Sequence, residues 1–90
     1  MDYVAVVHKE PESDFGVSFP DFPGCITAGR TLDEAKSMAL EALRGHIGAM
    51  LDTGNIIPDP FTPEEVMRDP DFRDGVALLV TIEQAEKRSV

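Results

Sequence analysis

The sequence has a single cysteine, Cys25, and only two histidines among its 90 residues. One cysteine cannot form an internal disulfide, and no set of cysteines and histidines has the spacing of metal ligands. There is also no run of about 18 apolar residues to cross a bilayer, and no charged and then apolar leader follows Met1. We therefore expect a soluble, cytoplasmic protein of one small domain, with no membrane segment and no bound cofactor or metal.

Basic residues are scarce as well. Eight Lys and Arg stand against 17 Asp and Glu, which gives a net charge of −9. This balance argues against nucleic acid as a direct ligand, because the phosphate backbone repels an acidic surface. Strong acidity keeps a small protein soluble and also attracts basic partners, so the charge alone does not identify a partner.

No catalytic group stands out. Two-metal nuclease chemistry needs several converging carboxylates, and the expected strands contain neither Asp nor Glu: Tyr3–Val7, Phe15–Phe19, Cys25–Ala28 and Val76–Ile82. His8 and His46 are interpreted as structural or solvent-facing, and Cys25 as a small core residue and not a nucleophile. We therefore expect no enzymatic activity.

Residues 69–75, DPDFRDG, superficially resemble a calcium-binding loop. The spacing does not fit, because Arg73 stands where an oxygen ligand is needed and Asp74 stands where the loop needs glycine. A solvated acidic loop is the better interpretation.

Alternation and turn residues predict an antiparallel meander of three strands. Phe15, Val17 and Phe19 alternate with smaller residues, which places three large apolar side chains on one face of a strand. The polar stretch 8–14 is typical of a hairpin loop before this strand, and the stretch 20–24, with two prolines and a glycine, predicts a turn after it.

A long helix is expected from Thr31 to Thr53. Thr31 and Glu34 have the spacing of a capping box, and Gly54 stands where a left-handed residue ends many helices. One apolar stripe is expected to face the sheet: Leu32, Ala35, Ala39, Leu43, Ile47 and Met50. Gly45 and Gly48 weaken the helix, and we interpret them as permitting close packing against the sheet or a neighbouring subunit.

Residues 55–75 contain four prolines and a second capping box, Thr62 and Glu65, with Pro63 at the first helical position. One or two turns of helix are expected there, ending before Pro70. A fourth strand follows at 76–82. The predicted fold is α+β, an antiparallel three-stranded meander plus a fourth strand with one long helix packed on one face, in a domain of residues 1–83 with a polar tail at 84–90.

The helix covers only one face of this sheet, so the face that carries Tyr3 or Val4 is expected to stay partly open, together with part of the last strand. Uncovered apolar surface on a small domain usually marks an interface. We therefore expect a homodimer or a higher oligomer.

The segment DFGVSFPDFPGCITAG (residues 14–29), preceded by YVAVVHKEPES, resembles the N-terminal domain of HicB-like antitoxins. The resemblance extends over about residues 1–82 and implies a truncated ribonuclease-H-like fold, with the last strand beside the first and parallel to it. It also implies a partner: a small basic HicA-like toxin that cleaves mRNA and is neutralised when its active site is occluded. Family members often continue into a DNA-binding segment, and DNA binding by this chain is not expected without such an added C-terminal domain.

Carboxylates that flank aromatic rings at strand ends form our candidate toxin-binding surface: Glu10, Glu12, Asp14, Phe15, Asp21 and Phe22. The charges would steer a basic partner, and an exposed ring would supply buried contact area. The alternative for each single residue is an ordinary solvated loop. An alternative function is a free-standing oligomeric ribonuclease-H-like domain with weak metal-dependent nuclease activity or an unidentified ligand.

Overall fold

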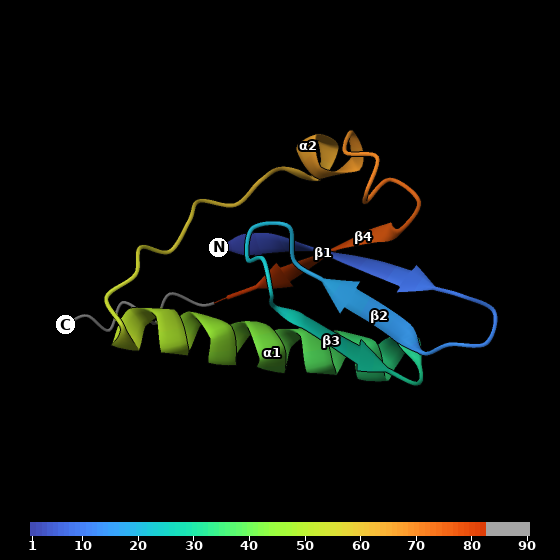
Figure 1. Ribbon diagram of the computed structural model, residues 1–90, viewed down its shortest axis with the longest axis horizontal. Coiled ribbons are helices and arrows are strands. Elements are labelled where there is room, and N and C mark those ends of the chain that lie inside the picture. The colour runs from blue at the N-terminus through green and yellow to red at the C-terminus, as the bar shows by residue number, and fades with distance from the viewer. Residues whose placement is uncertain (83–90) are drawn as a thin grey trace.

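The computed structural model describes residues 1–82, which form one antiparallel sheet with a long helix across one face (Figure 1). The expected polar tail at 84–90 and its boundary with the domain lie outside the described residues. The elements are β1 (Asp2–Lys9), β2 (Phe15–Ser18), β3 (Ile26–Gly29), α1 (Leu32–Asp52), α2 (Pro63–Met67) and β4 (Val76–Thr81). The strand order is β3-β2-β1-β4, which confirms the α+β fold of a meander plus a fourth strand.

The fourth strand corrects one expectation, because β4 lies beside β1 but runs antiparallel to it. The pairing extends from Asp2 opposite Thr81 to Val7 opposite Val76. The helix α1 ends near the end of the sheet where β1 begins, so a strand that started there would run parallel to β1. Residues 53–75 instead carry the chain back along the sheet before β4 starts (Figure 1).

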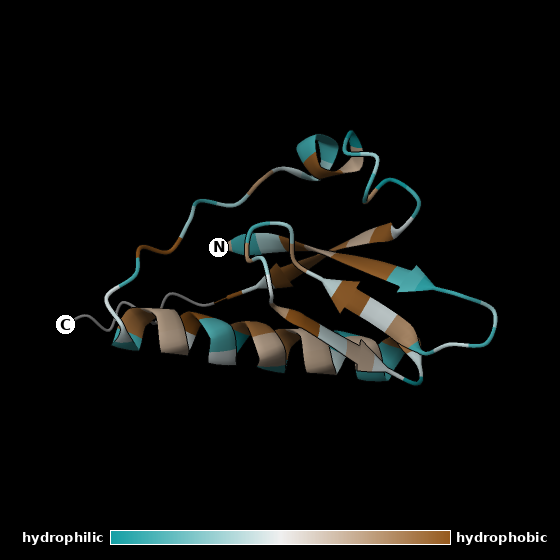
Figure 2. Cartoon of the chain, in the orientation of Figure 1, coloured by the Kyte–Doolittle hydropathy of each residue, from teal (hydrophilic) through white to brown (hydrophobic). Residues whose placement is uncertain are grey.

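The main core lies between α1 and the sheet. The helix buries Ala35, Ala39, Leu43 and Ile47 against residues of β1, β2 and β4, and Met50 packs at the margin of this cluster. In the hydropathy view the hydrophobic residues are concentrated in the middle of the strands, and the β1–β2 loop is hydrophilic (Figure 2).

The first residue of the predicted stripe does not belong to this core. Leu32 is 46% exposed and lies in neither buried cluster, whereas Ala35 of the same turn is fully buried. Gly29 at the end of β3 permits the close approach of this turn: a Cβ there would lie 2.7 Å from Ala35 Cα and 2.8 Å from the carbonyl carbon of Glu34.

The helix ends were predictable from the sequence. Glu34 N donates to Thr31 Oγ1 at 3.0 Å, and Gly54 follows the helix with a φ of +79°. Only half of the predicted capping box forms here, because the Glu34 carboxylate accepts from Arg30 N and not from Thr31 N. Gly45 and Gly48, in contrast, have open space where a side chain would begin. The close packing against the sheet that we expected of these two glycines is therefore absent.

The second face of the sheet is covered over β1, which corrects the expectation that this part of it is open. Val4 and Val6 are fully buried in a second cluster with Val66 of α2, against which Phe72 and Ala77 pack. The predicted capping box forms at the start of α2, where Thr62 N donates to Glu65 Oε1 and Glu65 N donates to Thr62 Oγ1. The strand β4 does retain exposed apolar side chains, as expected.

The core between α1 and the sheet leads to a first prediction. Leu43 is fully buried, so Leu43→Ala should lower the free energy of unfolding by about 2–5 kcal/mol because it removes contacts and leaves a cavity. The half-exposed Leu32 serves as the matched control, and Leu32→Ala should cost less than about 1 kcal/mol. Denaturant titration of both variants measures the difference, and equal losses would mean that the helix is rotated from the orientation described above.

Candidate functional site

Three of the candidate carboxylates lie on the loop between β1 and β2. Glu10, Glu12 and Asp14 are exposed, and Ser13 shapes the loop because its Oγ accepts a hydrogen bond from Glu10 N at 3.0 Å. Phe15 follows at the start of β2, half-buried against the main core, with Lys9 Nζ 5.6 Å from its ring centroid. The loop therefore presents charge to solvent but offers little exposed aromatic surface.

Asp21 and Phe22 lie beyond the other end of β2. Phe15 begins β2, whereas Asp21 lies in the turn after this strand, where Phe22 N donates to Phe19 O at 2.9 Å. Figure 1 shows the β1–β2 loop at one end of the sheet and the β2–β3 turn at the other. The structure thus divides the candidate residues between two surfaces and does not bring all six together.

Phe22 is not an exposed aromatic residue, contrary to our expectation. Its side chain is 1% exposed, with its ring edge-on to Tyr3 at 4.9 Å and to His46 at 5.7 Å between centroids. These contacts agree with the structural role expected of His46. Cys25 is also buried, as predicted, and burial raises the pKa of its thiol.

Asp21 lies where the β2–β3 turn meets the segment before α2. Its Oδ2 accepts a hydrogen bond from Phe61 N at 3.1 Å. Burial raises the pKa of Asp21; the hydrogen bond from Phe61 acts in the opposite direction, and the carboxylate of Glu65 raises it further. An acidic side chain is thus held partly out of water and close to a second one.

Tyr3 ties the same region to the sheet. Its hydroxyl donates to the carbonyl oxygen of Pro58 at 2.7 Å. The pKa of Tyr3 is raised, first by burial and then by the negative charges of Asp21 and Asp59. Burial is the larger cause of both pKa shifts, and neighbouring carboxylates raise each pKa further.

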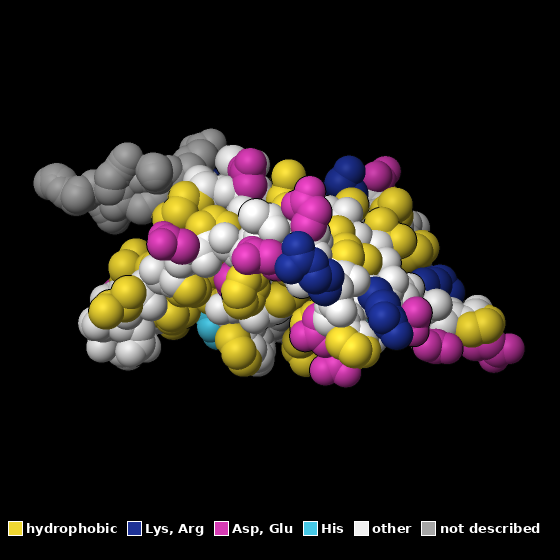
Figure 3. Space-filling view, turned by 90° about the horizontal axis from the view of Figure 1, so that it is seen from above, with side chains coloured by type: hydrophobic (Ala, Val, Ile, Leu, Met, Phe, Trp, Pro, Cys, Tyr) yellow, Lys and Arg dark blue, Asp and Glu magenta, His cyan; other side chains and the backbone are white. Residues whose placement is uncertain are grey.

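A groove of about 200 Å³ opens beside Asp21, and we call it the acidic groove; it is lined by Pro20, Phe61, Glu65, Val66, Asp69 and Phe72. Phe61 is 47% exposed. An exposed ring beside carboxylates suits the side chain of an arginine or a lysine, which can stack on the ring and pair with the acids. Figure 3 shows acidic side chains spread over the face that carries α2, with hydrophobic and some basic side chains between them.

No local pattern in the sequence indicates this groove, because Asp21 and Phe61, which join its two sides, are 40 positions apart. Phe61, Asp69 and Phe72 were not among the candidate residues. The local signals, Pro63 and the capping box, predicted the helix correctly but not the surface against which it packs. Within residues 1–82, no three His, Cys, Asp or Glu side chains are grouped so that they could hold a metal ion, and no helix is long and apolar enough to cross a membrane.

Comparison with protein families gives one match over almost the whole chain. Residues 3–89 match the family described as HicB-like antitoxin of bacterial toxin–antitoxin systems. A protein from the rep–hol intergenic region of Haemophilus phage HP1 is 37% identical over 67 residues, which are 74% of this chain and 50% of the phage protein. Antitoxin HicB 1 of Photorhabdus laumondii is 44% identical over 43 residues, 48% of this chain and 28% of that antitoxin.

Solved structures agree. The crystal structure of the Burkholderia pseudomallei antitoxin HicB superimposes with a TM-score of 0.87 at 31% identity, covering 96% of this chain and 66% of the antitoxin. A chain of a HicA3 and HicB3 toxin–antitoxin complex superimposes with a TM-score of 0.77 at 32% identity, covering 92% of this chain and 99% of that chain. This chain thus spans half the length of the phage relative and about two thirds of the Burkholderia antitoxin.

The burial of Phe22 leads to a second prediction. Phe22→Ala should lower the free energy of unfolding by about 3–5 kcal/mol, because it removes a buried ring from the core. Phe61→Ala, at a half-exposed ring, should cost less than about 1.5 kcal/mol. Thermal or denaturant unfolding compares the two directly, and a Phe22→Ala variant as stable as the parent would contradict the core assignment.

The raised pKa of Asp21 leads to a third prediction. The folded state binds the proton of the Asp21 carboxyl more tightly than the unfolded chain does. The free energy of unfolding therefore falls as pH rises from the unfolded to the folded pKa, and the loss stays constant above both values. Asp21→Asn removes the charge but keeps an oxygen to accept from Phe61 N. The variant should therefore be more stable than the parent at pH 7, and the difference should shrink toward about pH 3. Unfolding curves of both proteins across this pH range measure the difference in stability. A variant that is less stable than the parent at pH 7 would contradict the prediction.

Proposed function

This chain belongs to the HicB-like antitoxin family of bacterial toxin–antitoxin systems, and we propose that it binds a small basic HicA-like toxin and neutralises it by occluding the toxin's active site. A similar HicB3 chain forms part of a HicA3 and HicB3 toxin–antitoxin complex. A toxin that cleaves mRNA must hold a polyanion and so presents basic side chains. The proposal places both proteins in the cytoplasm, where mRNA is translated.

The acidic groove is the observation that carries this proposal. It combines the carboxylates of Glu65 and Asp69 with the exposed ring of Phe61, beside the half-buried Asp21. A basic side chain that enters the groove would exchange water for a ring and several acidic oxygens. Ring stacking and charge-assisted hydrogen bonds are among the stronger contributions to binding at an interface.

Asp21 supports this assignment in a second way. Its pKa is raised, chiefly by burial, so its ionised form is less favourable in the free protein than in the unfolded chain. Perturbed titratable groups of this kind cluster at functional sites. A cation from the toxin would stabilise the ionised form, so Asp21 contributes more in the complex than in the free chain.

The β1–β2 loop has a different role in this proposal. Its exposed carboxylates, Glu10, Glu12 and Asp14, act over a distance and steer the toxin toward the antitoxin. Phe15, which packs on the core, supports this loop from beneath. Phe22 acts indirectly, because it packs on Tyr3, which in turn anchors Pro58 near the acidic groove.

The fourth prediction separates steering from contact. Glu12→Lys should slow association with a HicA-like toxin of the same host severalfold at low salt and much less at high salt, because salt screens an exposed charge. Phe61→Ala should speed dissociation about tenfold or more at both salt concentrations, because it removes buried contact area. Surface-immobilised, catalytically inactive toxin allows both rates to be measured.

Glu41→Lys is the matched control. It makes the same change of charge at an exposed position on α1, away from both surfaces, and should alter the association rate only through net charge. A parallel assay of mRNA cleavage should show that one equivalent of the parent chain stops the toxin. If Phe61→Ala binds and inhibits like the parent, the acidic groove is not the contact; if the parent itself does not inhibit, the antitoxin function is refuted.

A further inference from the structure

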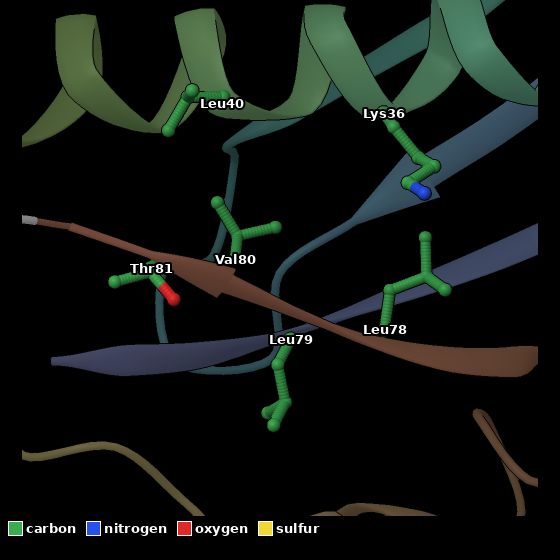
Figure 4. A pocket seen from close by; sticks show the side chains of 6 residues that line it. All are labelled: Lys36, Leu40, Leu78, Leu79, Val80 and Thr81. Carbon is green, nitrogen blue, oxygen red and sulfur yellow. The ribbon is translucent and has the colours of Figure 1, made fainter.

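The cluster around α2 covers only part of the second face of the sheet, the face opposite α1. Its cover lies over Val4 and Val6 of β1. Side chains alternate between the two faces along each strand. Figure 4 shows this alternation on β4, where Leu78 and Val80 point toward α1 and Leu79 points to the second face. The same alternation places part of β2 and β3 on the second face, to one side of the α2 cluster.

Four residues form this part of the sheet, which we call the β2–β3 face: Gly16, Ser18, Ile26 and Ala28. Ser18 lies opposite Val6, and Ile26 lies opposite Ser18, so both share the face of Val6. Ile26 is 70% exposed and Ala28 is also exposed, whereas Gly16 and Ser18 are half-buried. None of the four carries a charge, and β3 is the edge of the sheet farthest from β4. The β2–β3 face is thus a surface of small, uncharged residues with one large apolar side chain.

Carboxylates lie at both ends of the β2–β3 face. At one end Pro20, which is at most about 7 Å from Ser18, lines the acidic groove. At the other end the β1–β2 loop leads directly into β2 and exposes Glu10, Glu12 and Asp14. An uncharged strip therefore joins the two acidic surfaces at opposite ends of the sheet. An apolar centre with a polar rim is the usual composition of a protein interface.

Two basic side chains near the loop make contacts within the chain. Lys9 Nζ donates to Glu10 O at 2.8 Å and lies 5.6 Å from the ring centroid of Phe15. Arg30, which follows β3, has its Nε 3.9 Å from Glu34 Oε1. These contacts leave an excess of acidic charge at the loop end, so both ends of the β2–β3 face favour a basic neighbour.

We propose that the β2–β3 face is the apolar centre of the contact with a HicA-like toxin, whose matching surface carries apolar side chains with basic groups on both sides. This inference rests on the proposed function and adds the surface that joins its two acidic parts. Gly16 and Ser18 allow the partner to approach the sheet closely, and Ile26 supplies apolar area to be buried. Residues near the centre of an interface contribute most to retention, and the charged ends steer and orient the partner.

Charge favours a basic partner over a second copy on this face. In a two-fold contact centred on Ile26, each end of one face would meet an end of the other, and carboxylates lie at every end. Each chain also has a net charge of −9. Acidic groups facing each other across a contact repel, whereas a basic protein gains favourable charge pairs at both ends.

Binding to immobilised, inactive toxin tests the apolar centre. Ile26→Ala should weaken binding at least about fivefold, and Ala28→Gln, which adds bulk to a surface of small residues, at least about tenfold. Both effects should persist at high salt, because neither arises from charge. Leu51→Ala and Ala49→Gln make comparable changes at exposed positions on α1 and should bind like the parent. Circular dichroism shows whether each variant is folded.

Thiol labelling locates the contact without relying on affinity. Ala28→Cys and Ala49→Cys place a thiol at exposed positions on β3 and α1, and the native Cys25 is buried in both. Because a thiol reacts only when it is accessible, saturating toxin should slow labelling at position 28 at least about tenfold. Labelling at position 49 should not change.

The outcomes separate this inference from the proposed function. A parent chain that does not bind the toxin overturns both. If the parent binds but Ile26→Ala and Ala28→Gln bind equally well, or if the toxin protects position 49 and not position 28, this inference alone is overturned. Sedimentation that shows a dimer of the parent, lost in Ile26→Ala and Ala28→Gln, would assign the β2–β3 face to a second copy and overturn it as well.

Discussion

The burial of β1 on both faces is the constraint on which the rest of this fold depends. Tyr3, Ala5 and Val7 face α1, and Val4 and Val6 face α2, so five consecutive residues lose contact with water. A strand of this kind cannot lie at an edge or next to solvent, and it needs a neighbour on each side and a layer on each face. The strands β2 and β4 supply the neighbours, and α1 and the segment around α2 supply the layers.

Local features of the chain were predictable because they depend on residues a few positions apart. The Thr31 cap of α1, the capping box of α2, the left-handed Gly54 and the alternation in β2 all follow from short-range geometry, and the structure confirms each of them. The family resemblance was equally informative, because its turn motif is specific. The fold class could thus be predicted from the sequence almost completely.

The errors concern contacts between distant residues. Phe22 has the sequence neighbours of an exposed loop residue, and only the proximity of Tyr3 and His46 makes it part of the core. Leu32 follows the helical period yet stays half-exposed outside the core. The hydrogen bond between Asp21 and Phe61 spans 40 positions, so nothing near either residue could have indicated the acidic groove. The direction of β4 depended in the same way on the path of the 53–75 segment.

That path also governs when the fold can form during synthesis. Val66, Phe72 and Ala77 cover the inner side chains of the first strand, and β4 completes its second edge, although both are made near the end of the described chain. Until the ribosome has released them, Val4 and Val6 have no cover, and the nascent chain exposes apolar surface to chaperones and proteases. Long-range closure of this kind slows folding, since the entropy of a large loop is lost before the contacts form. A chain interrupted before residue 76 would lack β4 and part of this cover, and would leave one edge of β1 unpaired.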